Sequence, residues 1–437
     1  MIQQIKKRSI SIFIIIIIVI IVVAGYLNKK IGVDESGFYY VNVEGKIINK
    51  QPVGESAECG SFNDAGIAYI NEIFVPKIDK NRSTGGVFID TNGNIIKNKV
   101  FDSNFNSISG KVSFPVVMYD YGKVMILDED LNEIGELQGD YSVEAGIGFR
   151  HFFSEGLAEV NVEGAGSGYI NTNGEWIIEP KFKNADNFNA NGVACAQDSN
   201  TELWGYINKK GDWIIEPKYK DVYKGSEDGS ITIAINSETG MEGYIDINGN
   251  ELSGEWYDYA SEFSDGYALV QKGEKAAYIN SNGKCITDYI YDRHGSQSGF
   301  SEGLACVKLY GEEKYGYINE NGETVIEPKY NHALEFSCGL APVVNENNEN
   351  VYIDKEGNVV IDTCKDMKLY PFSKDGYAAV CKDDKYGIIN TKGEFVFEPQ
   401  FSNNIEGNSS IDVPIVENGY FVVYLEKGQQ IKKNKIK

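Results

Sequence analysis

Short runs of apolar and aromatic residues, separated by glycine turns, follow one another along most of this chain. The pattern is clear at 157–160, 168–170 and 176–178, which alternate in polarity and are rich in β-branched or aromatic residues. Such runs are typical of strands with a buried face. Residues 171–174 read Asn-Thr-Asn-Gly, and Asn and Gly adopt positive φ at low cost. We therefore expect the second and third runs to form a tight hairpin.

The same succession of runs recurs with a period of about 36 residues. The glycine of the Asn-x-x-Gly turn falls at Gly174, Gly211, Gly249, Gly283, Gly322, Gly357 and Gly393. A weaker frame continues upstream through Gly45 and Gly93 to Leu131, where the glycine has been lost. A phenylalanine followed by glycine and a small apolar stretch precedes most turns, at Phe62, Phe153, Phe188, Phe263, Phe300, Phe336 and Phe372. The spacing predicts about ten units.

Each unit is too small to bury its apolar face alone, so neighbouring units must stack. Proline has no amide hydrogen for a strand ladder, so we expect central strands to stop before the prolines of the Glu-Pro dipeptides. These prolines are Pro180, Pro217, Pro328 and Pro399, and each follows a glutamate. The predicted fold class is all-β: about ten three- to four-stranded antiparallel repeats in a propeller-like array. One wide ring, two smaller rings and an open β-solenoid remain alternatives.

Two more apolar runs, 411–415 and 420–424, follow the last full unit. In a ring they would complete the first blade of the array, whereas in a solenoid they would cap its end.

The stretch Trp204-Gly-Tyr-Ile-Asn208, followed by Gly211, Pro217 and Tyr219, resembles the bacterial WG repeat family. The core of that family reads W/Y-G-Y-I-N/D-x-x-G-x-x-x-I-x-P-x-Y/F. The resemblance is strong over 151–401 and weak over 37–150, and it departs from the pattern near Leu131 and over 96–113. Two units, which end near Tyr257 and Tyr291, lack the Glu-Pro. The resemblance implies a β-repeat domain that serves as a binding or assembly surface, with no catalytic residues to carry over.

The N-terminus has a different composition. Residues 1–8 include the basic cluster Lys6-Lys-Arg8, and 9–26 form an almost uninterrupted apolar run of about 18 residues. We expect a single transmembrane signal anchor at 9–26 and a linker at 27–36, with the N-terminus cytoplasmic and the array outside the cell membrane. Secretion after signal cleavage is the alternative. The repeat array then occupies 37–425, and 426–437 form a basic tail.

Charge and cysteine content narrow the possible partners. The formal net charge is −23, with 64 acidic and 41 basic residues, which argues against a nucleic-acid partner. The cysteines show no C-x-x-C spacing, so neither a zinc site nor a redox pair is indicated. They are Cys59, Cys195, Cys285, Cys306, Cys338, Cys364 and Cys381. Cys195 and Cys306 occupy the same place in their units and are interpreted as small strand residues, and disulfides between neighbouring units remain open.

No catalytic, cofactor or metal site emerges from the sequence. The three histidines, His151, His294 and His332, fall in different units, and no nucleophile motif accompanies them. The acidic run 128–130 and the Asp-x-Asn-Gly turns look like fragments of calcium loops but lack the ligand spacing of an EF-hand. We therefore expect a non-enzymatic protein without a cofactor.

The function that we expect is a membrane-anchored scaffold outside the cytoplasm, whose stacked units bind an unknown protein through an aromatic face. The candidate residues are Tyr169, Trp176, Trp204, Tyr206, Trp213, Tyr244, Tyr278, Tyr317 and Tyr352. The equivalent tyrosines should line one edge or layer of the array. The alternative is a cell-wall or glycan-binding protein, because aromatic hairpins also stack on sugars.

Overall fold

The computed structural model describes most of the repeat region. The described residues are 37–48, 62–74, 84–101, 112–120, 123–137, 152–224, 226, 228–293, 299–402 and 413–433. The predicted anchor at 9–26 and linker at 27–36 lie outside them, as do Cys59, His151 and His294. In the described part, no helix has the length and apolar character needed to span a membrane.

All the regular structure of the described residues is β-strand, apart from one short 3-10 turn, η1 (Ile96–Asn98). The pairing order divides the strands into seven sheets. One two-stranded sheet pairs β2 (Ile67–Phe74) with β3 (Thr84–Asp90). The next sheet along the chain holds β4 (Val116–Asp120), β5 (Lys123–Leu127) and β6 (Glu133–Glu136). An eight-stranded sheet holds β7 (Ala158–Val162), β8 (Gly166–Ile170), β9 (Trp176–Ala185), β10 (Val193–Asp198), β11 (Trp204–Asn208), β12 (Trp213–Lys224), β13 (Ile231–Asn236) and β14 (Glu242–Asp246).

The remaining sheets complete the array. One three-stranded sheet holds β15 (Tyr259–Ala260), β16 (Tyr267–Lys272) and β17 (Lys275–Asn280), and a second holds β18 (Leu304–Lys308), β19 (Tyr315–Asn319) and β20 (Thr324–Tyr330). A four-stranded sheet holds β21 (His332–Ala333), β22 (Ala341–Val344), β23 (Asn350–Ile353) and β24 (Val359–Ile361). A six-stranded sheet joins β25 (Lys368–Leu369), β26 (Tyr377–Lys382), β27 (Lys385–Asn390) and β28 (Phe395–Ser402) to β29 (Tyr420–Leu425) and β1 (Gly37–Asn42).

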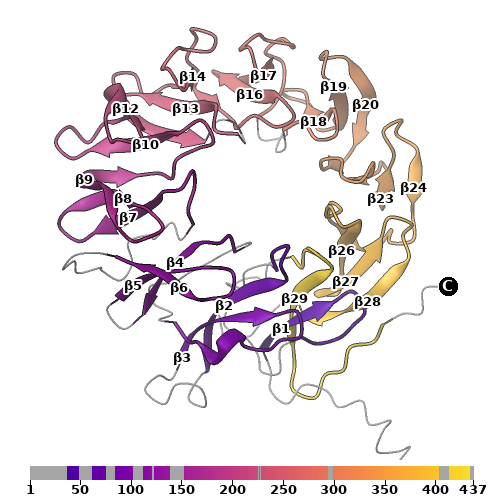
Figure 1. The fold of residues 1–437 in the computed structure, drawn as a ribbon. Coiled ribbons are helices and arrows are strands. Elements are labelled where there is room, and N and C mark those ends of the chain that lie inside the picture. Colours follow the sequence, from indigo (N-terminus) through magenta and orange to yellow (C-terminus); the bar gives the residue numbers. More distant parts are fainter. Residues whose placement is uncertain are drawn as a thin grey trace, which may run out of the picture.

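Ten antiparallel strand pairs repeat around one ring (Figure 1). We number the units by these pairs, from 1 to 10: β29/β1, β2/β3, β4/β5, β7/β8, β10/β11, β13/β14, β16/β17, β18/β19, β22/β23 and β26/β27. Unit 1 is built from both ends of the array, because β29 supplies its first strand and β1 its second. The array is a single ring, and of the two alternatives for the last apolar runs the structure shows completion of the first blade. Only the run at 420–424 does so, as β29, whereas residues 413–415 of the other run form no strand.

Hydrophobic packing is concentrated between neighbouring units. The buried residues form ten clusters, and each cluster combines side chains from two consecutive units. One cluster contains Tyr39 and Val41 of unit 1 together with Ile388 of unit 10, so the two ends of the array share a core. We call the interface between consecutive units a junction. Because the described apolar side chains are buried in junctions, no unit has a separate core among the described residues.

The predicted Asn-x-x-Gly turn recurs in all ten units with the same hydrogen bonds. In unit 8 the amide of Gly322 donates to the carbonyl of Asn319, and Asn319 Oδ1 accepts from the amides of Asn321 and Glu323. Gly322 has φ +78°, a conformation that favours glycine. The degenerate turn of unit 3 keeps the same fold with Leu131 at φ +55°, where the buried side chain packs in a junction. The short polar residue at the start of each turn therefore folds it locally.

The strands do not stop at the prolines, contrary to the expectation from sequence. β9, β12, β20 and β28 run through Pro180, Pro217, Pro328 and Pro399. In unit 4 the pairing of β8 with β9 skips from Ile178 to Phe182, which is a bulge around Pro180. A bulge leaves residues without a ladder partner, so the missing amide hydrogen costs nothing there. Beyond this bulge β9 pairs with β10 of the next unit, as Phe182 opposite Asp198 shows.

The glycine of the Trp-Gly-Tyr-Ile motif allows this bulge to approach the second strand. A Cβ atom on Gly205 would lie 2.3 Å from the carbonyl oxygen of Ile215 and 3.0 Å from the nitrogen of Pro217. Gly168, Gly316 and Gly387 meet the equivalent backbone atoms of their own units. The glycine and the proline of the motif therefore act together: the proline lies in the bulge, and the glycine leaves space for the bulged backbone to approach the second strand.

Hydrogen bonds from loop side chains add to the junctions. In four units a serine follows the recurring phenylalanine of the repeat. Its Oγ donates a hydrogen bond to the carbonyl of the equivalent phenylalanine in the next unit. One of these bonds joins Ser301 to Phe336 at 2.7 Å. Between units 1 and 2 the Nδ2 of Asn418 donates to the carbonyl of Phe62, 356 residues away in the chain. This bond ties the last part of the array to its second unit.

Candidate functional site

The six tyrosines predicted to form a binding face lie inside the ring wall. Tyr169, Tyr206, Tyr244, Tyr278, Tyr317 and Tyr352 are each at most 2% exposed. They occupy equivalent positions on the second strand of their units and therefore share one layer, as expected. The layer faces the junctions, because the next unit covers the side chain that a lone unit would expose. We therefore assign these tyrosines to the core, which corrects their placement on an exposed face.

The tyrosine hydroxyl is also satisfied across the junction. Tyr169, Tyr244, Tyr317 and Tyr352 donate to main-chain carbonyls 17 or 18 residues later, at 2.5 to 2.8 Å. Burial raises the pKa of Tyr244, Tyr317 and Tyr352 well above the usual value for a phenol. These hydroxyls therefore remain protonated donors, and their role is structural.

The three predicted tryptophans are half-buried and have different surroundings. Trp213 packs edge-on against Phe182 of the neighbouring unit, with ring centroids 5.4 Å apart. Trp204 lies opposite Tyr219 on the adjacent strand, and Trp176 begins β9. Only part of each indole reaches the surface, so the tryptophans form no continuous aromatic face.

At most junctions the tyrosine packs on the phenylalanine of the next unit. Six such pairs have ring centroids 4.7 to 5.3 Å apart: Tyr40 with Phe62, Tyr169 with Phe188, Tyr244 with Phe263, Tyr278 with Phe300, Tyr317 with Phe336, and Tyr352 with Phe372. Four junctions depart from this rule. Phe88 packs on Phe114 between units 2 and 3, and Ile126 stands in place of the tyrosine between units 3 and 4. Between units 10 and 1 the pair is replaced by Ile388 and Val416, and between units 5 and 6 Tyr206 has no phenylalanine partner among the described residues. Each of the last two junctions contains a pocket.

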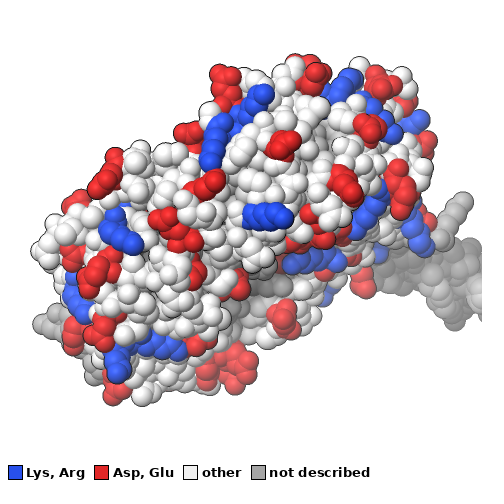
Figure 2. Space-filling view, turned by 90° about the horizontal axis from the view of Figure 1, so that it is seen from above, with Lys and Arg blue, Asp and Glu red and all other residues white. Residues whose placement is uncertain are grey.

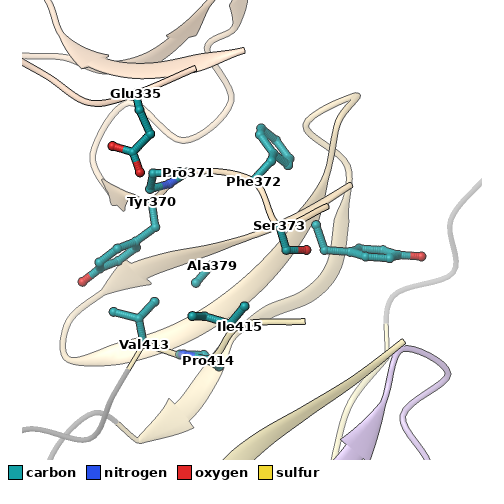
Figure 3. A pocket seen from close by; sticks show the side chains of 10 residues that line it. Glu335, Tyr370, Pro371, Phe372, Ser373, Ala379, Val413, Pro414 and Ile415 are labelled. Atoms are coloured by element: carbon teal, nitrogen blue, oxygen red, sulfur yellow. The ribbon is translucent and has the colours of Figure 1, made fainter. Parts of the chain in front are cut away.

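The pocket between units 10 and 1, here called the closure pocket, is mainly apolar (Figure 3). Its volume is about 250 Å³. It is lined by Glu335, Tyr370, Pro371, Phe372, Ser373, Tyr377, Ala379, Val413, Pro414 and Ile415. The segment with Val413 and Ile415 faces the one with Tyr370 and Pro371, and the Glu335 carboxylate points toward the latter. Ile415 is 68% exposed, the largest value among the large apolar side chains of the described residues.

Two polar side chains, Ser373 and Glu335, are among the residues that line the closure pocket. The Oγ of Ser373 is buried and has no hydrogen-bond partner among the described residues. In four other units the equivalent serine donates to a phenylalanine carbonyl of the next unit. Glu335 is partly exposed and is an acceptor for a donor or cation. The pocket thus joins an apolar lining to one hydroxyl and one carboxylate.

The closure pocket offers binding groups and lacks a catalytic set. Among the described residues that line it there is no histidine, lysine or cysteine to serve as base or nucleophile beside Glu335 and Ser373. His332, the one histidine within the described ranges, is exposed, and its ring centroid lies 5.6 Å from that of Tyr315. In the described ranges no group of three or more His, Cys, Asp or Glu side chains is arranged to hold a metal ion.

No disulfide joins neighbouring units among the described cysteines. Cys195 and Cys306 lie opposite the tyrosines of their units, Tyr206 and Tyr317. Cys306 is buried and its Sγ lies 3.5 Å from the carbonyl of Ala333. Burial raises the pKa of this thiol, so it is not activated as a nucleophile. The interpretation of these two residues as small strand residues agrees with their surroundings.

Sequence reasoning missed both pockets. The signal was present in the repeat alignment, since Val416 and Gly225 stand where other units have phenylalanine. A missing side chain at one repeat of an internal layer predicts a cavity, but only once the layer is known to be internal.

A family model described as "WG containing repeat" matches seven segments of the chain, at 168–200, 204–228, 243–275, 277–312, 315–348, 352–386 and 386–405. No curated protein matches the sequence.

Several solved structures are similar at low identity. The chain matches a structure described as a eukaryotic initiation factor, with TM-score 0.39 and 10% identity over 72% of this chain and 93% of that one. It matches the computationally designed Ika8 protein with TM-score 0.35 and 10% identity, over 70% and 96%. For BamB from Moraxella catarrhalis the values are 0.30 and 12%, over 55% and 81%. We draw no argument from likenesses at this level.

Proposed function

The chain is a WG repeat protein across residues 168–405, and from that premise we propose that it is a non-catalytic binding scaffold for another protein. The closure pocket carries this proposal. It is a partly open, apolar pocket in a ring whose other described junctions are mostly filled by tyrosine and phenylalanine. Ile415 at its rim is 68% exposed, so a bound partner would bury apolar surface there.

The chemistry of the closure pocket favours a polypeptide with an apolar side chain beside a basic residue. The apolar lining would bury the first side chain, and Glu335 would accept a hydrogen bond from the second. The net charge of −23 favours a basic partner in general. Figure 2 shows acidic and basic side chains interspersed on the side of the molecule seen when the ring is viewed from its edge, without a large area of one sign. The side chains of the pocket, more than a long-range electrostatic potential, would therefore select the partner. The negative net charge disfavours a nucleic acid as that partner.

This binding can be tested by peptide selection against the full chain. We expect a random peptide library to enrich sequences with an apolar residue next to lysine or arginine. Ile415→Asp should weaken binding of the enriched peptides at least tenfold, because it places a charge at the apolar rim. The matched control is Ile177→Asp, at a similarly apolar, 48% exposed position on β9, which should leave the affinity unchanged.

Equal weakening by both variants would contradict the closure pocket as the binding site. Preferential retention of the chain by isolated peptidoglycan, competed by free glycan, would instead support the cell-wall-binding alternative.

We further propose that residues 9–26 hold the ring at the outer side of the cell membrane. The supporting observation is the apolar run of about 18 residues preceded by Lys6-Lys-Arg8. Alkaline extraction of membranes should leave the full chain in the membrane fraction and release a version that begins at residue 37. Recovery of the full chain in the released fraction, with the apolar run intact, would refute the tether. Recovery without that run would support secretion after cleavage.

A further inference from the structure

Four units expose a β-branched residue at the same place on their third strand, which is β12 in unit 5. The exposed fractions are 48% for Ile177, 43% for Ile214, 44% for Val325 and 52% for Val360, in units 4, 5, 8 and 9. Each of these residues directly precedes an isoleucine that the same strand buries in a junction. An apolar surface residue therefore recurs at a fixed place in the repeat.

In unit 10 this place is covered by the chain itself. The equivalent residue, Val396, is 1% exposed, and residues 429–433 lie against its strand. The amide of Lys432 donates to Gln400 Oε1 at 2.8 Å, and Gln400 Nε2 donates back to the carbonyl of Lys432 at 2.8 Å. Ile431 packs against the cluster that contains Val396. An extended segment with one apolar side chain thus binds the third strand here.

The covering segment also reaches the turn of the next unit. A Cβ atom on Gly45 of unit 1 would lie 3.6 Å from the Cβ of Lys433. In unit 4 the corresponding place belongs to a side chain of the strand itself, because the Nζ of Lys181 would lie 3.1 Å from a Cβ on Gly211. Lys181 also donates to the carbonyl of Gly211 at 2.9 Å. Unit 4 therefore lacks the space that Lys433 uses in unit 10.

Unit 5 keeps this place free of such a side chain. The three atoms nearest to a Cβ on Gly249 all belong to Ile215, the buried residue of the strand. In unit 8 the hydroxyl of Tyr330 donates to the carbonyl of the next turn glycine, Gly357, and in unit 9 the hydroxyl of Thr363 makes the same kind of bond. Among the four units with an exposed β-branched residue, unit 5 therefore resembles unit 10 most closely.

Two exposed carboxylates flank Ile214 on the third strand. Asp212 and Glu216 lie two residues before and after it, and exposure alternates along this stretch. Side chains two residues apart on a strand lie on the same face, so the two carboxylates share a face with Ile214. In the segment that covers unit 10, two lysines directly follow Ile431. The surface of unit 5 is thus complementary in charge to a segment of this kind.

One residue makes unit 5 less suitable for the chain's own C-terminal segment. Lys218 stands at the position of Gln400, and its Nζ lies 5.0 Å from the ring centroid of Tyr219. A lysine donates to a peptide carbonyl but cannot accept from an amide, so it can make one of the two hydrogen bonds that Gln400 makes. The chain's own segment therefore prefers unit 10, and unit 5 is left for another polypeptide.

We propose that the third strand of unit 5 binds an extended segment of a partner protein, in which lysines follow a β-branched apolar residue. The apolar side chain covers Ile214, and the lysines lie beside Asp212 and Glu216. This site is separate from the closure pocket, which lies between units 10 and 1. It rests on the proposed function only in treating the ring as a binder of polypeptides.

The probe is the octapeptide Glu-Lys-Gly-Gln-Gln-Ile-Lys-Lys, the sequence of residues 426–433, with a fluorophore at its N-terminus and an amidated C-terminus. Fluorescence anisotropy should show saturable binding to the full chain. Ile214→Lys removes the apolar contact and adds a positive charge opposite the lysines, so it should weaken binding at least tenfold. Ile177→Lys is the matched control and should leave binding unchanged, because Lys181 fills the corresponding place in unit 4.

A gain of binding provides the second test. Lys218→Gln supplies the acceptor that Gln400 has in unit 10, and we expect it to strengthen binding about threefold to tenfold, the value of one hydrogen bond. Absence of saturable binding, equal binding by Ile214→Lys, or no gain from Lys218→Gln overturns the proposal.

Two further outcomes would overturn it in favour of another occupant or another site. Self-association of the full chain that Ile214→Lys and Ile431→Asp both abolish would identify a second copy of this chain as the occupant. Loss of octapeptide binding in Ile415→Asp, with normal binding by Ile214→Lys, would place the peptide in the closure pocket. Since Ile415→Asp should otherwise leave octapeptide binding unchanged, failure at one site is distinguishable from failure at the other.

Discussion

Tyr317→Ala is expected to lower the free energy of unfolding by about 3–5 kcal/mol, in the range found when large aromatic residues are removed from cores. Tyr317 is fully buried, its ring packs on Phe336 at 4.9 Å, and its hydroxyl donates to the carbonyl of Leu334 at 2.8 Å. The substitution removes a contact between two units, so both should lose stability. Urea denaturation followed by tyrosine and tryptophan fluorescence measures the change.

The matched control is Tyr317→Phe, which keeps the ring and removes the hydroxyl. It should cost about 1 kcal/mol, the usual net value of one hydrogen bond. A loss below 1 kcal/mol for Tyr317→Ala, accompanied by weaker partner binding, would contradict the core assignment and restore the tyrosines to an exposed binding face.

Removal of β29 is expected to have the larger effect on the ring as a whole. A chain that stops after residue 412 lacks Phe421, Val423 and Leu425, each at most 2% exposed. Burial of each such side chain contributes about 1.5–3 kcal/mol, so the loss approaches the total stability of a typical domain. β1 also loses its whole strand partner. We expect a broad unfolding transition in circular dichroism and a more expanded particle in small-angle scattering.

Two comparisons make the truncation interpretable. Asn418→Ala removes the hydrogen bond to Phe62 but keeps β29, and should cost about 1 kcal/mol. A peptide of residues 413–433 added to the truncated chain should restore the sharp transition. If the truncated chain unfolds as sharply and as late as the full one, pairing of β29 with β1 does not hold the ring together.

The repeat unit and its turn could be predicted because their causes are local. The Asn or Asp that begins each turn accepts hydrogen bonds from the amides of that same turn. Such a turn can be recognised in the sequence without knowledge of the rest of the fold. This is why even unit 3, with Leu131 in place of glycine, could be placed in the right frame. Counting the apolar runs left over after the last turn also offered completion of unit 1 by β29 as one of two alternatives, and the structure decides between them.

The path of the third strand and the side chains available for binding could not be predicted in the same way. Pro180 reads as a strand terminator in isolation, but the bulge and the close approach at Gly168 let β9 continue into the next unit. Tyr169 reads as a surface residue of a small hairpin until another unit covers it. Both outcomes depend on contacts between units. The two pockets are harder still, since each lies at a junction where the sequence repeat lacks its phenylalanine.

The pairing of β29 with β1 has a consequence for the order of the units in the gene. Gly37 lies opposite Leu425, so the end of β29 reaches the start of β1 as the two strands of an ordinary hairpin do. In unit 7 the corresponding strands, β16 and β17, are connected directly through Gly273 and Glu274. A short loop from Leu425 to Gly37 would therefore give a circular polypeptide, which could be opened at another hairpin without changing any strand pairing. In topological terms, the ten units have a cyclic order with no obligatory first member.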